Sequence, residues 1–343
     1  MKPLIALLLL LPAPAFAYGE VVDGRPSAHE RALHFFTDQL RVDPDFTDPQ
    51  FADYPPVRPL IHADALNEAA RFYADDMAAN GCFPADHSSC DGTPFGERLS
   101  LFYTGQGIGE NILKGRAAPD ASVFEGWLYS DGHRENMLNP DWIELGTGYA
   151  STGHHWVQDF GIRPDIDEPI ATSGTHWPLT GSASGSTRYF LAVHDPEGPI
   201  DEAVVVVDGL RRRLEGDRGD DQDGTFVAEV DNADEGCRSY HFEVTRGDGS
   251  LARYPTTGLL QATVGGEACA PWIAGAEPGD GFEGPGLGSA GNGCDEGGGN
   301  SAGPGSNQRE DNVALGTCSL RGRPPAPSLL LLSLCGLALR RRR

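Results

Sequence analysis

Apolar residues recur at helical spacing soon after the start of the chain. Leu33, Phe36 and Leu40 share one face of a helix at this spacing. Ser27 and Glu30 precede them as a capping box, in which each side chain satisfies the backbone N–H of the other residue. The pattern therefore predicts an amphipathic helix that begins just after Ser27 and buries one stripe.

A second and a third helix are predicted further along. The second lies between Asp64 and Gly81, and Gly81 provides the left-handed cap that ends it. Its apolar positions repeat at intervals of three and four residues: Leu66, Ala70, Tyr73 and Met77. The third helix is predicted from Asp120, acting as the cap, to Gly132.

Two β-prone runs follow these helices. Residues 143–149 and 155–162 alternate or are continuously apolar, and the Ser-Thr-Gly turn between them predicts a β-hairpin. Residues 81–119 have no sustained period and many Gly and polar residues, which predicts loops and short pieces held by a Cys82–Cys90 bridge. The fold class expected here is α+β, with helices covering a small antiparallel sheet.

The pattern changes after residue 180. Short β-prone runs are separated by turn residues at regular spacing, at 189–194, 203–207, 225–230, 240–245 and 259–264. We therefore expect a small all-β sandwich over 181–272, resembling immunoglobulin-like or fibronectin-like modules. Its acidic segment 217–224 suits either a calcium loop or a hairpin turn, although the terminal Glu of a complete calcium loop is absent.

One segment before the two predicted domains and one segment after them have recognisable patterns of their own. A charged start, an apolar run and Ala15-Phe16-Ala17 predict a secretory signal over residues 1–17. The first domain would then span 18–170. Residues 273–317 are rich in Gly, which predicts a disordered linker or stalk after the β-sandwich.

The C-terminal segment 318–343 has the pattern of an anchor signal. Cys318 precedes an apolar stretch that would span about 21 Å as a helix, short of the roughly 30 Å hydrocarbon core of a bilayer. An Arg cluster ends the segment. The arrangement resembles the MYXO-CTERM sorting signals of myxobacteria, which implies cleavage near Cys318 and attachment to the cell surface. An ordinary short tail anchor is the alternative.

Net charge and cysteine spacing indicate which partners and which cysteine chemistry to expect. The 343 residues carry a formal net charge of -24, which repels a phosphate backbone, and the Arg runs at 211–213 and 340–343 are too local to reverse this. Nucleic acid is therefore not an expected partner. Export permits disulfides, and no Cys-x-x-Cys spacing indicates a zinc knuckle. The local pairs are Cys82 with Cys90 and Cys237 with Cys269, which leaves Cys294, Cys318 and Cys335.

Four short motifs contain the candidate chemistry: His87-Ser88, Gly109-Glu110-Asn111, Gly132-His133-Arg134 and His155-Trp156-Val157-Gln158. Two neutral imidazoles near a carboxylate can bind zinc, or the carboxylate can orient a histidine that accepts a proton. A polar network that holds loops on the sheet without any ligand is the third interpretation. His133 is expected directly after the third helix, where a helix C-terminus favours the protonated ring.

The same motifs, together with Trp127 and the run Trp156-Val157-Gln158-Asp159-Phe160-Gly161, resemble a CAP domain of the bacterial SCP-like branch. The CAP superfamily comprises the cysteine-rich secretory, antigen 5 and pathogenesis-related 1 proteins. The resemblance covers residues 27–163 and implies an α-β-α sandwich with a central cleft.

The resemblance also implies which residues line that cleft. The eukaryotic branch lines the cleft with two His and two Glu. His87, Glu110 and His155 match three of these four residues. Ser130 stands where that branch has its second Glu, and His133 lies nearby in the sequence. The expected cleft therefore contains His87, Glu110, Ser130, His133 and His155, with His87 and His155 as candidate zinc ligands.

The expected function is that of an exported, surface-attached protein that binds a small or lipid-like ligand, or an extracellular partner, in this cleft. Enzymatic activity is the less favoured hypothesis for this chain. The enzyme alternative is a metal- or His-assisted hydrolase of peptide or cell-wall material, with Glu110 and His133 as catalytic candidates, although Gly-x-Ser-x-Gly and His-Glu-x-x-His are absent. A purely structural surface or adhesion module is the other alternative. Membrane contact is expected only through the C-terminal anchor.

Overall fold

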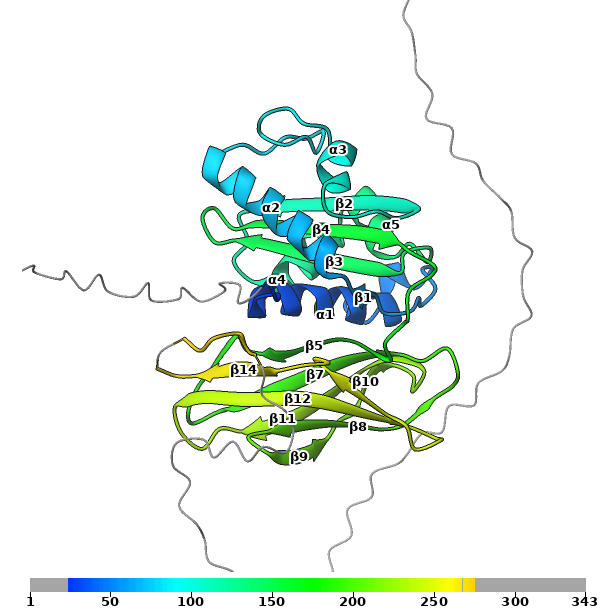
Figure 1. Ribbon diagram of the computed structural model, residues 1–343, viewed down its shortest axis with the longest axis vertical. Helices are drawn as coiled ribbons and strands as arrows, with labels where there is room; N and C mark the ends of the chain where they lie inside the picture. The colour runs from blue at the N-terminus through cyan, green and yellow to red at the C-terminus, as the bar shows by residue number, and fades with distance from the viewer. Residues whose placement is uncertain (1–23, 267, 275–343) are drawn as a thin grey trace, which may run out of the picture. The chain divides into compact units, whose positions relative to one another are not determined.

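A four-stranded mixed sheet forms the centre of the first half of the chain (Figure 1). The computed structural model describes residues 24–266 and 268–274, so the predicted signal, stalk and anchor segments lie outside the described residues. The strand order is β1-β3-β4-β2, with β1 parallel to β3 and the other pairs antiparallel. The strands are β1 (Ile61–His62), β2 (Gly107–Lys114), β3 (Glu144–Ala150) and β4 (His155–Ile162).

The predicted hairpin is β3–β4. The loops and short pieces predicted over 81–119 include the six-residue helix α3 (Phe95–Ser100) and the eight-residue strand β2, which the pattern did not identify as a strand. β2 pairs with β4 along its whole length, from Gly107 opposite Ile162 to Lys114 opposite His155. The glycines in β2 interrupt the alternation of apolar and polar residues by which a strand is predicted from sequence. They are required by packing, because a Cβ at Gly109 would come within 2.7 Å of the Trp142 ring.

Two long helices cover the two faces of this sheet. α1 (Ala28–Val42) begins at the predicted capping box, with Glu30 N–H donating to Ser27 Oγ and Ser27 N–H donating to Glu30 Oε2. α2 (Asp64–Asn80) ends at Gly81 in the left-handed conformation, as predicted. Gly148 of β3 lets α2 approach closely, since a Cβ there would lie 2.2 Å from the Ala70 backbone.

The predicted third helix is not continuous. Its residues form α4 (Pro119–Ala121), the π-helical turn η2 (Ser122–Trp127) and, after a break, α5 (Asp131–Met137). The wide turn is closed by Leu128 N–H donating to Val123 O. It leaves Trp127 fully buried, with its indole N–H donating to Ile112 O at 3.0 Å. The Trp127 ring belongs to the hydrophobic core of the first half.

The second half of the chain consists of two sheets around a shared apolar core. One sheet has the order β10-β11-β7-β5 and the other β15-β14-β12-β8-β9, with β13 paired to β12 and β6 to β14. All five predicted strands are present, and β5 begins before the predicted boundary at 181. The strands are β5 (Ala171–Trp177), β6 (Thr180–Gly181), β7 (Ser186–His194), β8 (Ile200–Val207), β9 (Leu210–Arg213), β10 (Glu215–Gly219), β11 (Asp223–Asp231), β12 (Gly236–Arg246), β13 (Leu251–Tyr254), β14 (Leu259–Val264) and β15 (Trp272–Ile273).

α1 is buried on all sides, because it packs against both β3 and the sheet that contains β5 and β7 (Figure 1). The Phe35 and Phe190 rings lie 4.8 Å apart across this contact. Gln39 donates to Asp217 Oδ2 on β10 at 2.5 Å. The two halves of the described chain therefore share one hydrophobic core, to which both Phe35 and Phe190 belong.

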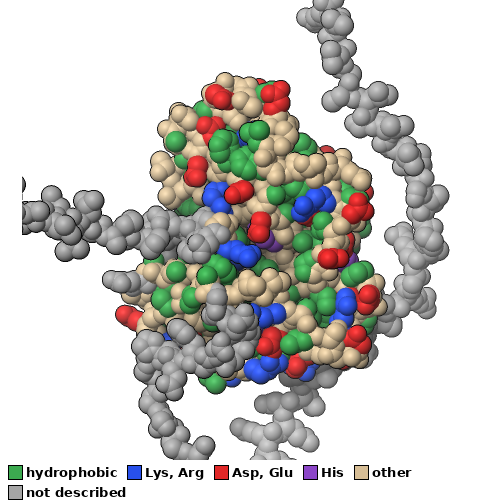
Figure 2. Space-filling model, in the orientation of Figure 1, with side chains coloured by type: hydrophobic (Ala, Val, Ile, Leu, Met, Phe, Trp, Pro, Cys, Tyr) green, Lys and Arg blue, Asp and Glu red, His purple; other side chains and the backbone are tan. Residues whose placement is uncertain are grey.

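Several smaller features complete the described chain. Cys82 with Cys90 and Cys237 with Cys269 form disulfides. The acidic segment around Asp220 is the turn between β10 and β11, where Asp220 Oδ1 accepts from the Gln222 and Asp223 N–H groups. None of the helices described between residues 24 and 274 has the length and apolarity to span a bilayer. On the face in Figure 2, acidic and basic side chains are interspersed.

Candidate functional site

A buried carboxylate on β2 holds the ring of His87. Only 1% of the Glu110 side chain is exposed, and its Oε1 lies 2.8 Å from His87 Nδ1. His87 is 28% exposed and adopts a left-handed backbone conformation with φ 61°. With Nδ1–H donating to the carboxylate, Nε2 of the neutral ring becomes a hydrogen-bond acceptor. The pair therefore fixes both the tautomer and the orientation of His87.

Arg98 holds this pair in place. Its Nη2 forms an ion pair with Glu110 Oε2, and its Nη1 donates to the His87 carbonyl at 2.9 Å. The guanidinium is almost fully buried and lies over the Tyr73 ring, 3.5 Å from the centroid. One arginine thus binds the carboxylate and the backbone of the histidine together.

Asp159 lies on β4 directly opposite Glu110, on the same sheet face. It is fully buried, and burial raises the pKa of Asp159 well above its usual range, with the neighbouring Glu110 adding to the rise. Among the described residues, no N–H or O–H group donates to either Asp159 oxygen. Burial and the neighbouring Glu110 charge therefore favour the protonated form of Asp159.

His133 lies in the first turn of α5, so its predicted place after a helix C-terminus was wrong. The break after η2 starts a new helix at Asp131, which puts the ring near the positive end of a helix. Burial lowers the pKa of His133, and the nearby His87 lowers it further. The ring is therefore neutral near pH 7, not protonated as expected.

Ser130 directly precedes α5 but does not cap its backbone. Its Oγ lies 2.8 Å from His133 Nδ1. Two amides tie this segment to β2: Asn111 Nδ2 donates to the His133 carbonyl, and Asn136 Nδ2 donates to the Glu110 carbonyl. The Gly-Glu-Asn motif thus supplies one side chain to the site and another that positions the neighbouring helix.

His155 is not brought into contact with the other predicted residues. It pairs with Lys114, four positions along the strand from the Asp159 and Glu110 pair, or about 13 Å. Its Nδ1 donates to Thr152 O at 2.9 Å, and its ring lies 6.3 Å from Phe83. His155 therefore stabilises its own hairpin turn in this structure.

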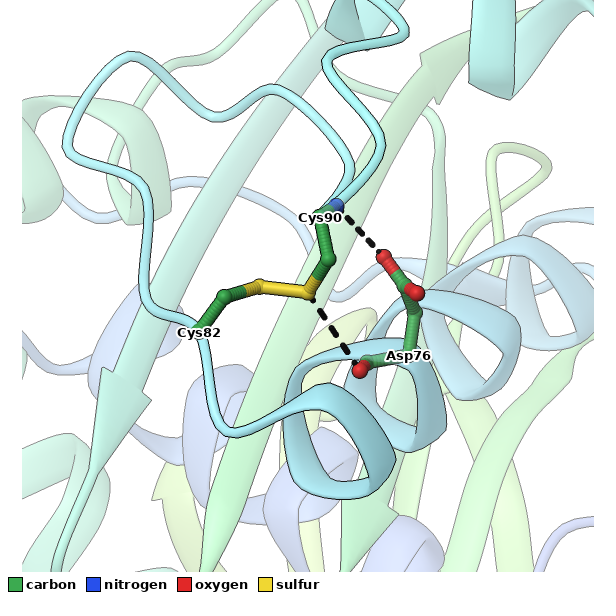
Figure 3. A group of neighbouring side chains, drawn as sticks. All are labelled: Asp76, Cys82 and Cys90. Atoms are coloured by element: carbon green, nitrogen blue, oxygen red, sulfur yellow. Dashed lines mark hydrogen bonds between the residues drawn. A yellow bond between two sulfur atoms is a disulfide. The ribbon is translucent and has the colours of Figure 1, made fainter.

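No contact among the described residues joins the predicted zinc ligands: His87 pairs with Glu110, and His155 pairs with Thr152. Both Glu110 oxygens are engaged, one by a ring N–H and the other by a guanidinium whose charge opposes a cation. Among the described residues, the group of His, Cys, Asp and Glu donor atoms close enough for one ion is Asp76, Cys82 and Cys90 (Figure 3). Its cysteines form a disulfide and supply no thiolate, so we derive no metal chemistry from either group.

Two site residues were missed from the sequence. Asp159 is a charged residue at an inward position of a buried strand, which is a signal that could have identified it. Arg98 follows an irregular loop, and nothing in the local pattern indicated that it would reach Glu110.

Comparison with known proteins finds a family match in the first half of the chain. Residues 39–160 match the cysteine-rich secretory protein family, CAP. This match supports a CAP domain in the first half of the chain, and it includes both strands that carry Glu110 and Asp159.

Individual relatives match over part of their length. The uncharacterized protein YkwD of Bacillus subtilis is 37% identical over 105 residues, 30% of this chain and 40% of that protein, so the chain spans less than half of this relative. An extracellular SCP-domain protein of Bacillus anthracis is 29% identical, with 31% of this chain and 35% of that chain covered and a TM-score of 0.29. An outer surface protein of Borrelia burgdorferi is 21% identical, with 42% of this chain and 98% of that chain covered and a TM-score of 0.33.

Proposed function

We propose that this chain is an exported, surface-attached protein whose CAP domain binds a small extracellular ligand, polar or lipid-like, at His87 and His133. Two proteins similar to it are described as an extracellular protein and an outer surface protein. The pairing of disulfides with an N-terminal signal pattern supports export. Surface attachment rests on the sequence pattern at 318–343.

The observation that carries the binding proposal is the buried Glu110 carboxylate between His87 and Arg98. Burying this charged group has a large desolvation cost, which is typical of a site rather than of simple packing. When the His87 ring is neutral, this contact leaves its Nε2 as a hydrogen-bond acceptor, and His133 lies close enough for His87 to lower its pKa. Two adjacent imidazole acceptors suit a ligand with hydroxyl or amide N–H donors.

Side-chain NMR of the histidine rings tests this proposal. We would titrate the protein with muramyl dipeptide and, separately, with dihexanoyl phosphatidylglycerol, as polar and lipid-like probes. The expected result is that one probe shifts the His87 and His133 ring signals, and that His87→Ala abolishes binding. His62→Ala is the matched control, because His62 also has a carboxylate partner, Asp64, at 3.0 Å but lies outside the site. Binding that survives His87→Ala, or two probes that shift neither ring, would contradict the proposal.

The hydrolase alternative is supported by the contact between Ser130 Oγ and His133 Nδ1 at 2.8 Å. In that reaction His133 would accept the hydroxyl proton as Ser130 attacks an ester or amide carbonyl. A fluorophosphonate probe should then label the wild type and Ser100→Ala, but not Ser130→Ala. Ser100 is the matched control, since its hydroxyl makes only a local contact with Glu97 O. An unlabelled wild type would exclude this alternative.

A further inference from the structure

An edge strand with three consecutive arginines lies in the second half of the described chain (Figure 1). β9 ends the sheet β15-β14-β12-β8-β9 and, among the described residues, pairs with β8 alone. Its four residues, Leu210–Arg213, are all exposed. The chain carries a formal net charge of -24, so this run concentrates positive charge on an otherwise acidic protein.

The backbone of β9 presents polar groups at this edge. Directly after the strand, Leu214 N–H donates to Ala203 O at 2.9 Å. Alternate residues of an antiparallel strand bond to the same neighbour, so Arg212 also bonds to β8. The N–H and C=O groups of Arg211 and Arg213 therefore point away from the sheet. One of them, the Arg211 carbonyl, accepts from the exposed Arg212 Nη1 at 3.0 Å.

The other edge strands of this half are irregular or very short, whereas β9 is neither. β10 and β5 each have a register shift, between Gly216 and Arg218 in β10 and between Ala171 and Ser173 in β5. Such bulges interrupt the row of backbone groups that a further strand would need. β15, at the opposite end of the sheet from β9, has two residues. β9 pairs with β8 in continuous register, so its free edge can accept another strand.

The charges on β9 select the kind of strand that it can accept. Arg211 forms an ion pair with Glu243 of β12, whereas Arg212 and Arg213 form none with any described residue. Pairing of β9 with the β9 of a second copy would place arginine opposite arginine, which is destabilising. The edge is therefore unfavourable for a second copy and favourable for an acidic strand.

The residues around β9 limit the length of that acidic strand. Asp208 precedes the basic run and Glu215 follows it, so an acidic partner is repelled beyond both ends of β9. Leu210 is 57% exposed and offers one apolar contact at the edge. The matching partner is an extended segment as long as β9, with acidic side chains opposite the arginines and an apolar side chain opposite Leu210.

We propose that β9 binds an extended acidic segment of a partner protein by strand addition. The segment pairs with the outward N–H and C=O groups of Arg211 and Arg213, and its carboxylates bond to the guanidinium groups of Arg212 and Arg213. Backbone pairing supplies the affinity, and the arginines supply the selectivity for acidic side chains. The edge shares no residue with the His87 site, so the two proposals stand or fail separately.

Fluorescence anisotropy on the whole chain tests the proposal with the labelled peptide Thr-Glu-Glu-Glu-Val-Thr. In antiparallel pairing its three Glu lie opposite the arginines and its Val lies opposite Leu210. One control peptide carries Lys in place of Glu. A second is N-methylated at the first and third Glu, which keeps the charge but removes the two N–H groups that would bond to β9. Each control should bind at least about 10-fold more weakly than the acidic peptide.

Two substitutions at Arg213 separate its charge from its backbone. Arg213→Gln should weaken binding of the acidic peptide about 2- to 5-fold, since the charge is exposed. Arg213→Pro also removes the outward N–H, which does not bond to β8, and should weaken binding about 3- to 10-fold further. Arg188→Gln is the matched control, because Arg188 is exposed on β7, a strand that is paired on both sides. It should leave the affinity unchanged.

The peptide controls keep the test decisive even if a variant folds poorly, because they leave the protein unaltered. No binding of the acidic peptide at millimolar concentration would overturn the proposal. Equal binding of the N-methylated peptide would also overturn it, since it would show a contact between charges without strand addition. So would a dimer in sedimentation velocity that Arg213→Pro dissociates, because the edge would then belong to a second copy of the chain.

Discussion

Glu110 and Asp159 face each other across β2 and β4, and burial together with the Glu110 charge raises the pKa of Asp159 well above its usual range. Arg98 neutralises the charge that remains on Glu110. This arrangement separates the roles of the two acids. Glu110 is the anion that orients His87, whereas burial favours the protonated form of Asp159 beside it.

Replacing Asp159 with Asn should therefore be tolerated. An amide is neutral, as the protonated acid is, so we expect a change of less than about 1 kcal/mol in the free energy of unfolding. Arg98→Met should cost about 3–5 kcal/mol, because it leaves Glu110 charged and buried without a partner. Urea unfolding at pH 7 measures both. Equal losses in the two variants would show that Asp159 is ionised.

Three buried histidines should make the protein less stable in acid. Burial lowers the pKa of His29 to about 4 and the pKa values of His34 and His176 to about 3, from an ordinary value of 6.5. Between about pH 3 and 6.5 the unfolded chain binds protons that the folded chain does not, so each histidine makes stability rise with pH across this window. Urea unfolding at a series of pH values gives the slope of the unfolding free energy against pH. In His176→Gln this slope should be shallower than in the wild type by the equivalent of about one bound proton. An unchanged slope would mean that His176 is protonated in the fold.

Asp38 should make the protein less stable as the pH rises, in contrast to the three histidines. Its carboxylate joins α1 to β5, accepting from Ser173 Oγ at 2.6 Å and from Leu60 N–H at 2.8 Å. Burial raises the pKa of Asp38 from 3.8 to about 7. The folded chain keeps this proton while the unfolded chain loses it, so this contribution falls as pH rises from about 4 to 7.

Substitution isolates that contribution. Relative to the wild type, Asp38→Asn should gain stability as the pH is raised from 4 to above 7, since Asn carries no charge at any of these values. The measurement is the difference in unfolding free energy between variant and wild type at the two ends of this range. A difference that is constant with pH would contradict the raised pKa.

The Cys82–Cys90 disulfide should support the His87 site. The bond closes a loop with a sequence separation of 8 that contains His87, so removing it with Cys82→Ser and Cys90→Ser should cost about 2–3 kcal/mol. It should also broaden the His87 ring signal in NMR. Replacing Cys237 and Cys269 by Ser is the control, since that loop lies in the β12–β14 region and should leave the His87 signal unchanged. Equal effects of the two double variants on His87 would show that the loop is held without its own disulfide.

Local rules predicted the elements whose signals are contained within a few residues. The capping box at Ser27 gave the start of α1, and Gly81 gave the end of α2. The β3–β4 hairpin and five strands of the second half also followed from the pattern. These signals depend on backbone conformation and side-chain spacing, which act over one or two turns.

The sequence by itself thus determined where helices and strands begin, which cysteines can pair locally, and the motifs that resemble a CAP domain. Only the tertiary structure decided what surrounds each residue. α1 reads as a helix with one buried stripe, yet it is buried all round because a second sheet packs on its polar face. The same holds for the site: strand register places Asp159 opposite Glu110 and His155 away from them, and the helix α3 carries the Arg98 that reaches Glu110. Strand register and packing between distant segments depend on the sum of many weak contacts. A pattern within a few residues therefore does not predict them.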